Sequence, residues 1–408
     1  MKLIVSNNDD GFYISEAIFP ELMNDVIKVN ISSGTTIIGN VKFTFSNILE
    51  FLFCLEKESL NIEQIIIYGA ISHFSSEINI RTAFAGFTSL VKGRLLYVDE
   101  KSRISSKLTL LNRCFTAINE EPSVRIHDGY IILDFDFPTR WSRFCHQEVK
   151  RATSEKTISH DQFISLLSDH IASKKPFSFI RLNHCENRIL GYDFSFSKEE
   201  ADITYDIQFG KVLNQKETGY ISSRIKEAVK NSTVLGIPQD NDLNSSKLRL
   251  LEHSTRIHLY KLSLLKDQLF TNVNIHYDLG QNEAFKKIIE SAENIVAITC
   301  RDISALEHKL GKTIKKISIP AENRFKGNDD HIYQHYPEAF NKIEQEIERI
   351  VSPGVVVLIG AGILGKIYCD TVFRHGGISI DVGSLMDAIE NIKTRGDGFE
   401  KFNFWWST

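Results

Sequence analysis

The sequence predicts an α/β protein of two domains, in which helices flank parallel β-sheets. The first observation is the length of 408 residues, because one domain usually holds roughly 100–200 residues. The second is the alternation of apolar, strand-like runs with segments of helical periodicity, which is typical of parallel sheets. The third is the composition, with 42% hydrophobic and 25% charged residues, which is ordinary for a globular protein with an apolar core.

The first domain is predicted to be the smaller one and to span residues 1–150. Its strands are expected at 2–6, 62–70 and 93–100, and its helices at 14–26, 47–59 and 107–121. The stretch "VRIHDGYIILDFDFP" is expected to form a hairpin with Asp128 and Gly129 as its turn. We place the domain junction in the charged and polar stretch 139–160, so that the second domain spans residues 151–408.

The second domain is predicted to hold a parallel sheet with helices between its strands. A helix is expected at 161–173, and strands at 176–182, 233–238, 294–300, 315–321, 355–359 and 377–382. The best-defined helix is "PEAFNKIEQEIERIV", where Pro337 suits the first helical turn. Its apolar residues recur three or four positions apart and predict one buried stripe, made of Phe340, Ile343, Ile347 and Ile350.

Charge and cysteine usage exclude several classes of protein. The net charge of −4 shows no basic excess, so no nucleic-acid partner is expected. The six cysteines form no Cys-x-x-Cys pair, which argues against structural zinc. Most of them sit within apolar runs, as buried free thiols do, which suits a reducing cytoplasm. The chain begins without a signal-peptide pattern, and its longest apolar run is shorter than the ~20 residues that span a bilayer. We expect a cytoplasmic protein, and leave peripheral association with the inner membrane face and homo-oligomer formation open.

Polar residues follow the strands of the second domain, at the edge where open α/β sheets bind ligands. Arginines, carboxylates and a glycine turn at such an edge fit a phosphate-bearing, hydroxyl-rich ligand. The residues concerned are Arg181 with 183–187, residues 239–242, Arg301 with Asp302, Glu322 with Asn323 and Arg324, the glycines of 360–365, and Asp381 with Gly383 and Ser384.

The glycine turn itself has the sequence pattern of a dinucleotide-binding site. A strand runs into Gly360-Ala-Gly362-Ile-Leu-Gly365, and a helical pattern follows. Asp381, near the end of the next strand, loosely fills the place of the acidic residue that holds a ribose. The turn stands late in the chain, however, and no second nucleotide-binding half follows it. An NAD-dependent oxidoreductase that uses the Gly360–Gly365 turn is therefore an alternative.

The stretch "KPFSFIRLNHCENRILG" carries a more specific resemblance. Followed in order by "GIP", "ITCRD", "ISIP", "LIGAGILGKIYCD" and "GGISIDVGSLMDA", it resembles the GT-D fold glycosyltransferases over about residues 155–400. In that family the first strand typically ends Arg-Phe-Gly-Asp-Gly-Glu. Here the matching positions keep Arg181 and Glu186 but place His184 where the family has aspartate. The resemblance implies a Rossmann-like, GT-D-type parallel sheet.

The resemblance implies a glycosyltransferase of the hexosyltransferase type, which moves a sugar from a nucleotide-sugar to a hydroxyl of a bacterial surface glycan, a lipid-linked glycan or a glycoprotein. It implies catalytic roles for Arg181, His184 and Glu186. His184 and Glu186 either ligate Mn²⁺ or Mg²⁺ or, with His184 bonded directly to the diphosphate, leave the metal dispensable. Donor contacts are expected from Arg301, Asp302, Glu322, Gly360, Gly362 and Asp381.

Four further assignments are weighed at this point. The first domain either holds the acceptor, mediates self-association or is a second catalytic unit. The departure at His184 leaves a non-catalytic protein of a polysaccharide locus as another alternative. Trp405 and Trp406 either stack on a sugar or dock the end of the chain, and docking is favoured. Asp134 and Asp136 fit a half-exposed strand better than a metal site.

Overall fold

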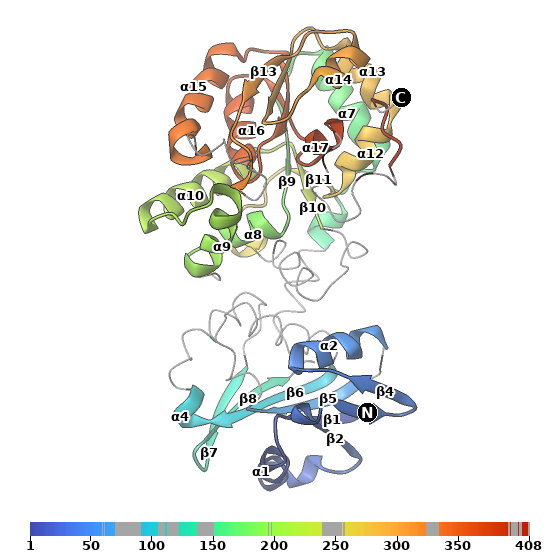
Figure 1. Ribbon diagram of the computed structural model, residues 1–408, viewed down its shortest axis with the longest axis vertical. Coiled ribbons are helices and arrows are strands. Elements are labelled where there is room, and N and C mark those ends of the chain that lie inside the picture. Colours follow the sequence, from blue (N-terminus) through green and yellow to red (C-terminus); the bar gives the residue numbers. More distant parts are fainter. Residues whose placement is uncertain are drawn as a thin grey trace. The chain divides into compact units, whose positions relative to one another are not determined.

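The computed structural model describes residues 1–58, 62–69, 91–104, 122–136, 151–194, 198–238, 258–323, 334–390 and 402–406, with single positions at 60, 111, 196, 255, 392 and 399. The chain divides into two compact units (Figure 1). The smaller unit comprises Met1–Glu148 with the short segments Asp193–Ser197 and Leu243–Ile257. The larger unit comprises Val149–Tyr192, Lys198–Asp242 and His258–Thr408.

The smaller unit is built on a six-stranded sheet of order β2-β1-β5-β6-β8-β7. The first four of these strands are parallel to one another, whereas β8 and β7 run antiparallel. The strands are β1 (Lys2–Ser6), β2 (Val26–Asn30), β5 (Ile62–Tyr68), β6 (Val91–Glu100), β7 (Ser123–His127) and β8 (Tyr130–Asp136). The prediction of a hairpin around Asp128 and Gly129 is confirmed, because β7 pairs with β8 across that turn.

The helices of the smaller unit cover both faces of its sheet (Figure 1). α2 (Ile48–Lys57) packs on one face beside a small hairpin, and α1 (Asp10–Ile18) packs on the other. The hairpin consists of β3 (Thr35–Ile38) and β4 (Val41–Thr44). The remaining elements are η1 (Pro20–Leu22), η2 (Ile31–Ser33) and α4 (Lys101–Ile104).

Two predictions for the smaller unit need comment. The helix expected at 14–26 is instead α1, which ends at Ile18, followed by η1 and the unpredicted strand β2. Pro20 explains this break, because proline has no N–H to continue a helix and its ring clashes with the preceding turn. The helix expected at 107–121 lies outside the described residues, except for Leu111.

The larger unit is built on seven parallel strands in the order β11-β10-β9-β15-β14-β12-β13. All six strands predicted for this part of the chain are present, and β11 was not predicted. The strands are β9 (Phe177–Arg181), β10 (Val234–Ile237), β11 (Leu269–Asn272), β12 (Ile295–Thr299), β13 (Lys315–Ser318), β14 (Val356–Gly360) and β15 (Ile378–Asp381). The predicted class, an α/β fold with a helix-flanked parallel sheet, is confirmed.

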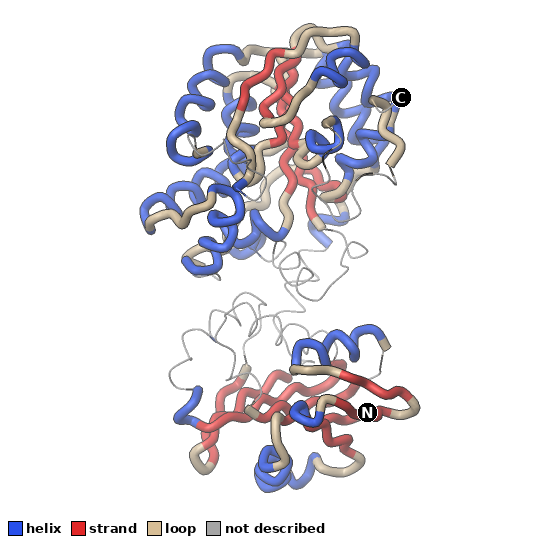
Figure 2. The backbone as a smooth tube through the Cα atoms, in the orientation of Figure 1, coloured by secondary structure: helices blue, strands red, loops and turns tan. Residues whose placement is uncertain are grey.

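Helices cover both faces of this sheet, giving three layers (Figures 1 and 2). One face carries α8 (His184–Leu190), α9 (Lys198–Phe209), α10 (Gln215–Asn231), α15 (Phe340–Ile350) and α16 (Leu364–Arg374). The other face carries α7 (His160–Ala172), α12 (Ile275–Gln281), α13 (Glu283–Ser291), α14 (Ser304–Leu310) and α17 (Leu385–Ile389). Alternate residues of the central strands enter the two cores, as the pleat of a sheet requires.

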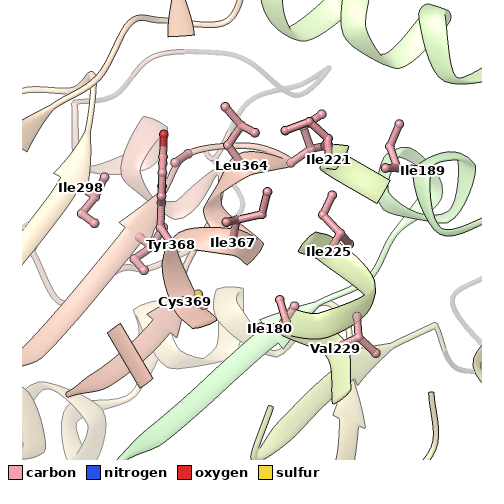
Figure 3. Close-up of a cluster of buried hydrophobic side chains, with 14 of the residues drawn as sticks. Ile180, Ile189, Ile221, Ile225, Val229, Ile298, Leu364, Ile367, Tyr368 and Cys369 are labelled. Atoms are coloured by element: carbon pink, nitrogen blue, oxygen red, sulfur yellow. The ribbon is translucent and has the colours of Figure 1, made fainter. Parts of the chain in front are cut away.

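α16 is a deeply buried helix. Its residues from Leu364 to Val372 are all buried between the sheet and neighbouring helices. Figure 3 shows Leu364 and Ile367 of this helix facing Ile221 and Ile225 of α10. A helix enclosed on all sides must satisfy every polar side chain within the protein, which places strong demands on its charged residues.

The predicted helix from Pro337 begins later than expected. α15 starts at Phe340, and Pro337 lies in the preceding π-type turn, His335–Ala339. The predicted stripe is otherwise present, since Phe340, Ile343 and Ile347 are buried. Most of the predicted domain junction, 139–160, lies outside the described residues, which resume at Arg151.

The last described residues dock against α12. Trp405 and Trp406 are buried, and the Trp405 indole N–H donates to the Leu279 carbonyl oxygen over 3.3 Å. The Trp405 amide donates to the Gly280 carbonyl oxygen over 3.0 Å. A Cβ at Gly280 would lie 2.6 Å from the Phe404 ring, so this glycine permits the close approach. The docking role favoured for the two tryptophans is confirmed.

Candidate functional site

The carboxyl ends of β9 and β15 lie side by side in the middle of the seven-stranded sheet. β9 is the first of these strands in the chain and β15 is the last, and their pairing is parallel. From β9 the chain builds outward through β10 and β11, and it continues on the far side of β15 with β12 and β13. Such a reversal is a topological switch point, where open α/β sheets bind their ligands.

Arg181 ends β9 and binds the end of β15 with both its backbone and its side chain. Its amide donates to Asp381 Oδ2 and its Nε donates to the Asp381 carbonyl oxygen, each over 3.1 Å. Its Nη1 donates to the Val273 carbonyl oxygen over 3.2 Å and lies 2.8 Å from His276 Nδ1. Gly383 leaves room for the guanidinium, because a Cβ there would lie 1.9 Å from Nη2. Arg181 is therefore fixed by the end of β15 and by the chain segment that follows β11.

A buried lysine in the first turn of α16 joins the two carboxylates of the site. Lys366 Nζ lies 2.9 Å from Glu186 Oε1 and 3.0 Å from Asp381 Oδ2. It also donates to the Gly362 carbonyl oxygen over 3.2 Å. The second oxygen of Glu186 accepts the Asn183 amide over 3.0 Å. We refer to the four ionisable side chains as the charge cluster, made of Arg181, Glu186, Lys366 and Asp381.

The charge cluster is almost closed to solvent, and its electrostatics follow from that. The side chains of Lys366, Glu186 and Asp381 are 5%, 7% and 3% exposed, whereas Arg181 keeps 12%. Burial by itself raises the pKa of Glu186. The Lys366 ammonium and the Asn183 amide have the opposite and larger effect, so the pKa falls from 4.5 to about 2. Burial lowers the pKa of Lys366, while Asp381 and Glu186 raise it well above its ordinary value. Glu186 and Lys366 are thus both ionised at neutral pH.

The glycine turn packs against a glutamine of α9. Gly362 has φ +56°, and a Cβ on it would lie 1.9 Å from Gln208 Oε1. The same Gln208 oxygen accepts the Ile363 amide over 3.3 Å. Gly360 is also closely packed, since a Cβ on it would lie 2.6 Å from the side chain of Met386. A dinucleotide phosphate would need the space beside Gly362 and the Ile363 amide. In this protein the side chain of Gln208 fills that space and accepts that amide.

The other predicted donor residues have partners of their own. Glu322, after β13, accepts Gln208 Nε2 over 2.7 Å and is thereby linked to the glycine turn. Arg301, after β12, pairs through Nε with Asp387 of α17 over 2.8 Å. Asp302 is exposed and accepts both the amide and the hydroxyl of Ser304, over 3.1 and 2.7 Å, at the start of α14. The structure thus brings Arg181 and Asp381 into direct contact, joins Glu186 to Asp381 through Lys366, and connects Glu322 to the turn. It gives Asp302 a contact with Ser304.

Some predicted positions lie wholly or partly outside the described residues. His184 is the first residue of α8, and its side chain lies outside the described part of the structure. Residues 239–242, which follow β10, and Arg324, which follows β13, also lie outside the described residues.

The described side chains do not fit a divalent cation at Glu186. The ammonium of Lys366 already lies between Glu186 and Asp381, and a second cation beside it would be repelled. Among the residues that the structure describes, no group of three or more histidine, cysteine, aspartate or glutamate side chains could hold a metal ion. The cation that the carboxylates of Glu186 and Asp381 bind in this structure is the Lys366 ammonium.

Three residues of the site were not predicted from the sequence, namely Gln208, His276 and Lys366. Lys366 carried the clearest signal, because it follows a glycine turn and stands among the apolar residues Leu364, Ile367 and Tyr368 of a buried helix. A lysine in such a place needs buried acidic partners. Gln208 and His276 lie in segments whose contacts with the strand ends depend on the tertiary fold, so the sequence gives no comparable signal for them.

Within the described parts of the chain, none of the helices combines the length and the apolar character needed to cross a membrane.

Comparison with known proteins identifies similarity in the larger unit. A family model for GT-D fold-like domains matches residues 158–389, which is more than half of the chain. No curated protein matches the chain. Two solved structures are similar, described as "Selenomethionine substituted structure of domain of unknown function 1792" and "The highly conserved domain of unknown function 1792 has a distinct glycosyltransferase fold". Each has 13% identity and a TM-score of 0.39, and the similarity covers 62% of this chain and 88% of the other.

Proposed function

Because this chain belongs to the family of GT-D fold-like domains, we propose that it is a glycosyltransferase that takes its sugar from a nucleotide-sugar. The proposed acceptor is a hydroxyl group of a bacterial surface glycan, a lipid-linked glycan or a glycoprotein. The proposed reaction uses the larger unit, since most of the residues in the family match belong to it.

The observation that carries this proposal is the meeting of distant chain segments at the switch point. Arg181 and Glu186 are the two positions at which this sequence keeps the family's strand-end pattern. Glu186 is bound to Lys366, which follows the glycine turn, and Arg181 is bound to Asp381. Segments about 180 to 200 residues apart in the chain thus build one charged site at the carboxyl edge of the sheet. A site at this edge suits a nucleotide-sugar.

Arg181 is the residue to which we assign the donor diphosphate. During transfer the diphosphate leaves with the electron pair of its bond to the anomeric carbon, so negative charge grows on its oxygens. A guanidinium held in advance at that place stabilises the charge without reorganising. Arg181 is the most exposed member of the charge cluster. Among the described residues its Nη2 has only a 3.7 Å ion pair with Asp381, which leaves donor capacity for a phosphate.

The geometry favours this function over the dinucleotide alternative. The Ile363 amide at the glycine turn is bonded to Gln208, and the side chain of Gln208 occupies the space beside Gly362. These contacts explain the glycines by packing between α9 and α16. A nicotinamide cofactor is therefore not needed to account for the motif.

Thermal unfolding in the presence of a panel of nucleotide-sugars tests the proposal, with NAD(H) as comparator. A ligand at one hundred times its dissociation constant stabilises a protein by about 2.7 kcal/mol. We expect at least one nucleotide-sugar to raise the melting temperature by several degrees and to be turned over. Arg181→Lys should weaken this effect, whereas Arg349→Lys, a matched change at an exposed arginine of α15, should leave it intact.

The alternatives give different results in the same experiment. A shift with NAD(H) alone would favour an oxidoreductase. The absence of any shift and of any donor turnover, in a protein that melts cooperatively, would favour a non-catalytic protein.

A further inference from the structure

The contacts of Lys366 bear on how the proposed site handles charge. Its Nζ has three acceptors: Glu186 Oε1 at 2.9 Å, Asp381 Oδ2 at 3.0 Å and the Gly362 carbonyl oxygen at 3.2 Å. An ammonium group has three N–H donors, so these contacts satisfy all of them. Lys366 is therefore locked in place at the point where the two carboxylates converge.

The carboxylates are equally committed to donors from the protein. The second oxygen of Glu186 accepts the Asn183 amide over 3.0 Å. Asp381 Oδ2 also accepts the Arg181 amide over 3.1 Å, and its Oδ1 lies 3.7 Å from Arg181 Nη2. Every carboxylate oxygen of the charge cluster thus faces a nitrogen of the protein. A divalent cation would have to displace at least one of these donors and would be repelled by the two that are cationic.

The position of Lys366 in the chain makes this arrangement a property of the fold. It stands in the first turn of α16, directly after the glycine turn, and the helix around it is buried. Its backbone cannot move outward without disturbing the packing of Ile367 and Leu364 against α10 (Figure 3). The ammonium is consequently supplied to the site whenever the larger unit is folded.

We propose that the Lys366 ammonium is the resident cation of this site and occupies the place between Glu186 and Asp381 that a divalent metal would otherwise take. Sugar transfer by this chain then needs no divalent metal at the charge cluster. This inference rests on the proposed function only for the transfer reaction, because the competition between ammonium and metal is a property of the protein alone.

Manganese binding tests the inference without any donor. Metal-free wild-type protein is titrated with Mn²⁺, and free Mn²⁺ is followed by electron paramagnetic resonance. Melting temperatures are recorded with EDTA and with millimolar Mn²⁺ for wild type and for Lys366→Met. We expect no stoichiometric Mn²⁺ binding to the wild-type charge cluster and no shift of its melting temperature. In Lys366→Met the two carboxylates lose their cation, so Mn²⁺ should bind and raise the melting temperature by several degrees. Lys174→Met, which removes the exposed ion pair with Glu293, is the matched control and should show no such rescue.

The result that would overturn the inference is one Mn²⁺ per wild-type chain whose binding is abolished by Glu186→Gln. If Lys366→Met does not fold, the titration of wild-type protein decides alone, and the absence of stoichiometric Mn²⁺ binding supports the inference. Transfer assays separate this inference from the proposed function. Transfer that persists in EDTA supports both, transfer that EDTA abolishes through a Glu186-dependent metal overturns the inference alone, and absence of transfer leaves the Mn²⁺ titration to decide.

Discussion

Lys366 and Glu186 form an ion pair of 2.9 Å although both side chains are almost completely buried. The same ammonium lies 3.0 Å from Asp381, so one cation links α8, at the end of the first strand of the sheet, to the last strand. Buried charges are tolerated when they are paired, and removal of one partner leaves the other uncompensated. This relationship makes the charge cluster both the proposed functional site and a point where the fold is vulnerable.

Replacement of Glu186 should therefore cost both stability and activity. We expect Glu186→Ala to lower the free energy of unfolding by about 3–5 kcal/mol, because Lys366 loses one of its two carboxylates in a buried site. Chemical denaturation measures this loss. The matched control is Glu293→Ala, which removes an exposed glutamate that pairs with Lys174 and should change stability little. Equal and small effects of the two substitutions would contradict the buried pairing.

The stability of the protein should depend on Glu186 at acidic pH. The pKa of Glu186 is about 2 in the folded protein, against an ordinary value of 4.5. Protons therefore bind preferentially to the unfolded chain, and the contribution of Glu186 is fully present above about pH 4.5. It is lost as the pH falls toward 2, by about 3 kcal/mol at 1.36 kcal/mol per unit.

Denaturation curves at several pH values compare wild type with Glu186→Gln for this purpose. The variant should lose less stability than wild type between pH 5 and pH 2. Parallel losses in the two proteins would show that Glu186 does not carry this pH dependence.

Gly362→Ala should be much more damaging than another substitution of a left-handed glycine. Both Gly362 and Gly311 have positive φ, at +56° and +60°, but only Gly362 faces a close neighbour, Gln208. We expect Gly311→Ala to cost about 1 kcal/mol for backbone strain and Gly362→Ala to cost about 1–3 kcal/mol more through the clash. Urea denaturation compares the two variants.

A second substitution checks the cause of this loss. Gly362→Ala combined with Gln208→Ala removes the atom that the new methyl group meets, and should recover part of the lost stability. If the double variant is less stable than Gly362→Ala by the full cost of Gln208→Ala alone, the two residues are not coupled and the packing explanation fails.

Trp405 should contribute to stability rather than to donor binding. Its indole is buried against α12, and its N–H is bonded to the Leu279 carbonyl oxygen. Trp405→Ala should lower the free energy of unfolding by about 3–5 kcal/mol, as for other buried tryptophans, and Trp405→Phe should lower it less. Calorimetry measures these losses. A variant that keeps its stability but binds nucleotide-sugars more weakly would instead indicate that the ring stacks on the sugar.

The strands of the larger unit could be predicted because their signal is local. Runs such as "FSFIR" and "VVVLI" are buried on both faces, and a buried parallel strand is largely apolar along its length. β11 escaped prediction because its sequence, "LFTN", is short and only half apolar. The end of α1 was misplaced although Pro20 marks it, since the apolar pattern continues past the proline into η1 and β2.

The site was only partly predictable, for a different reason. The order of the strands in the sheet decides which strand ends meet, and that order cannot be read from the sequence. Arg181 and Asp381 meet because β9 and β15 are neighbours. Arg301 stands at the end of β12, which β14 separates from β15, and it pairs with Asp387 instead. Lys366 completes the charge cluster from helix α16. It was missed because only the residues that follow the strands were considered as site residues.

The most direct test of the central claim is hydrogen–deuterium exchange of the full chain with and without a nucleotide-sugar that raises its melting temperature. The claim is that the donor binds next to Arg181, at the carboxyl edge of the seven-stranded sheet. We expect slower exchange in peptides that cover residues 182–187 and 382–386, which flank the charge cluster. Protection confined to peptides from residues 1–150, with these two segments unchanged, would contradict the account.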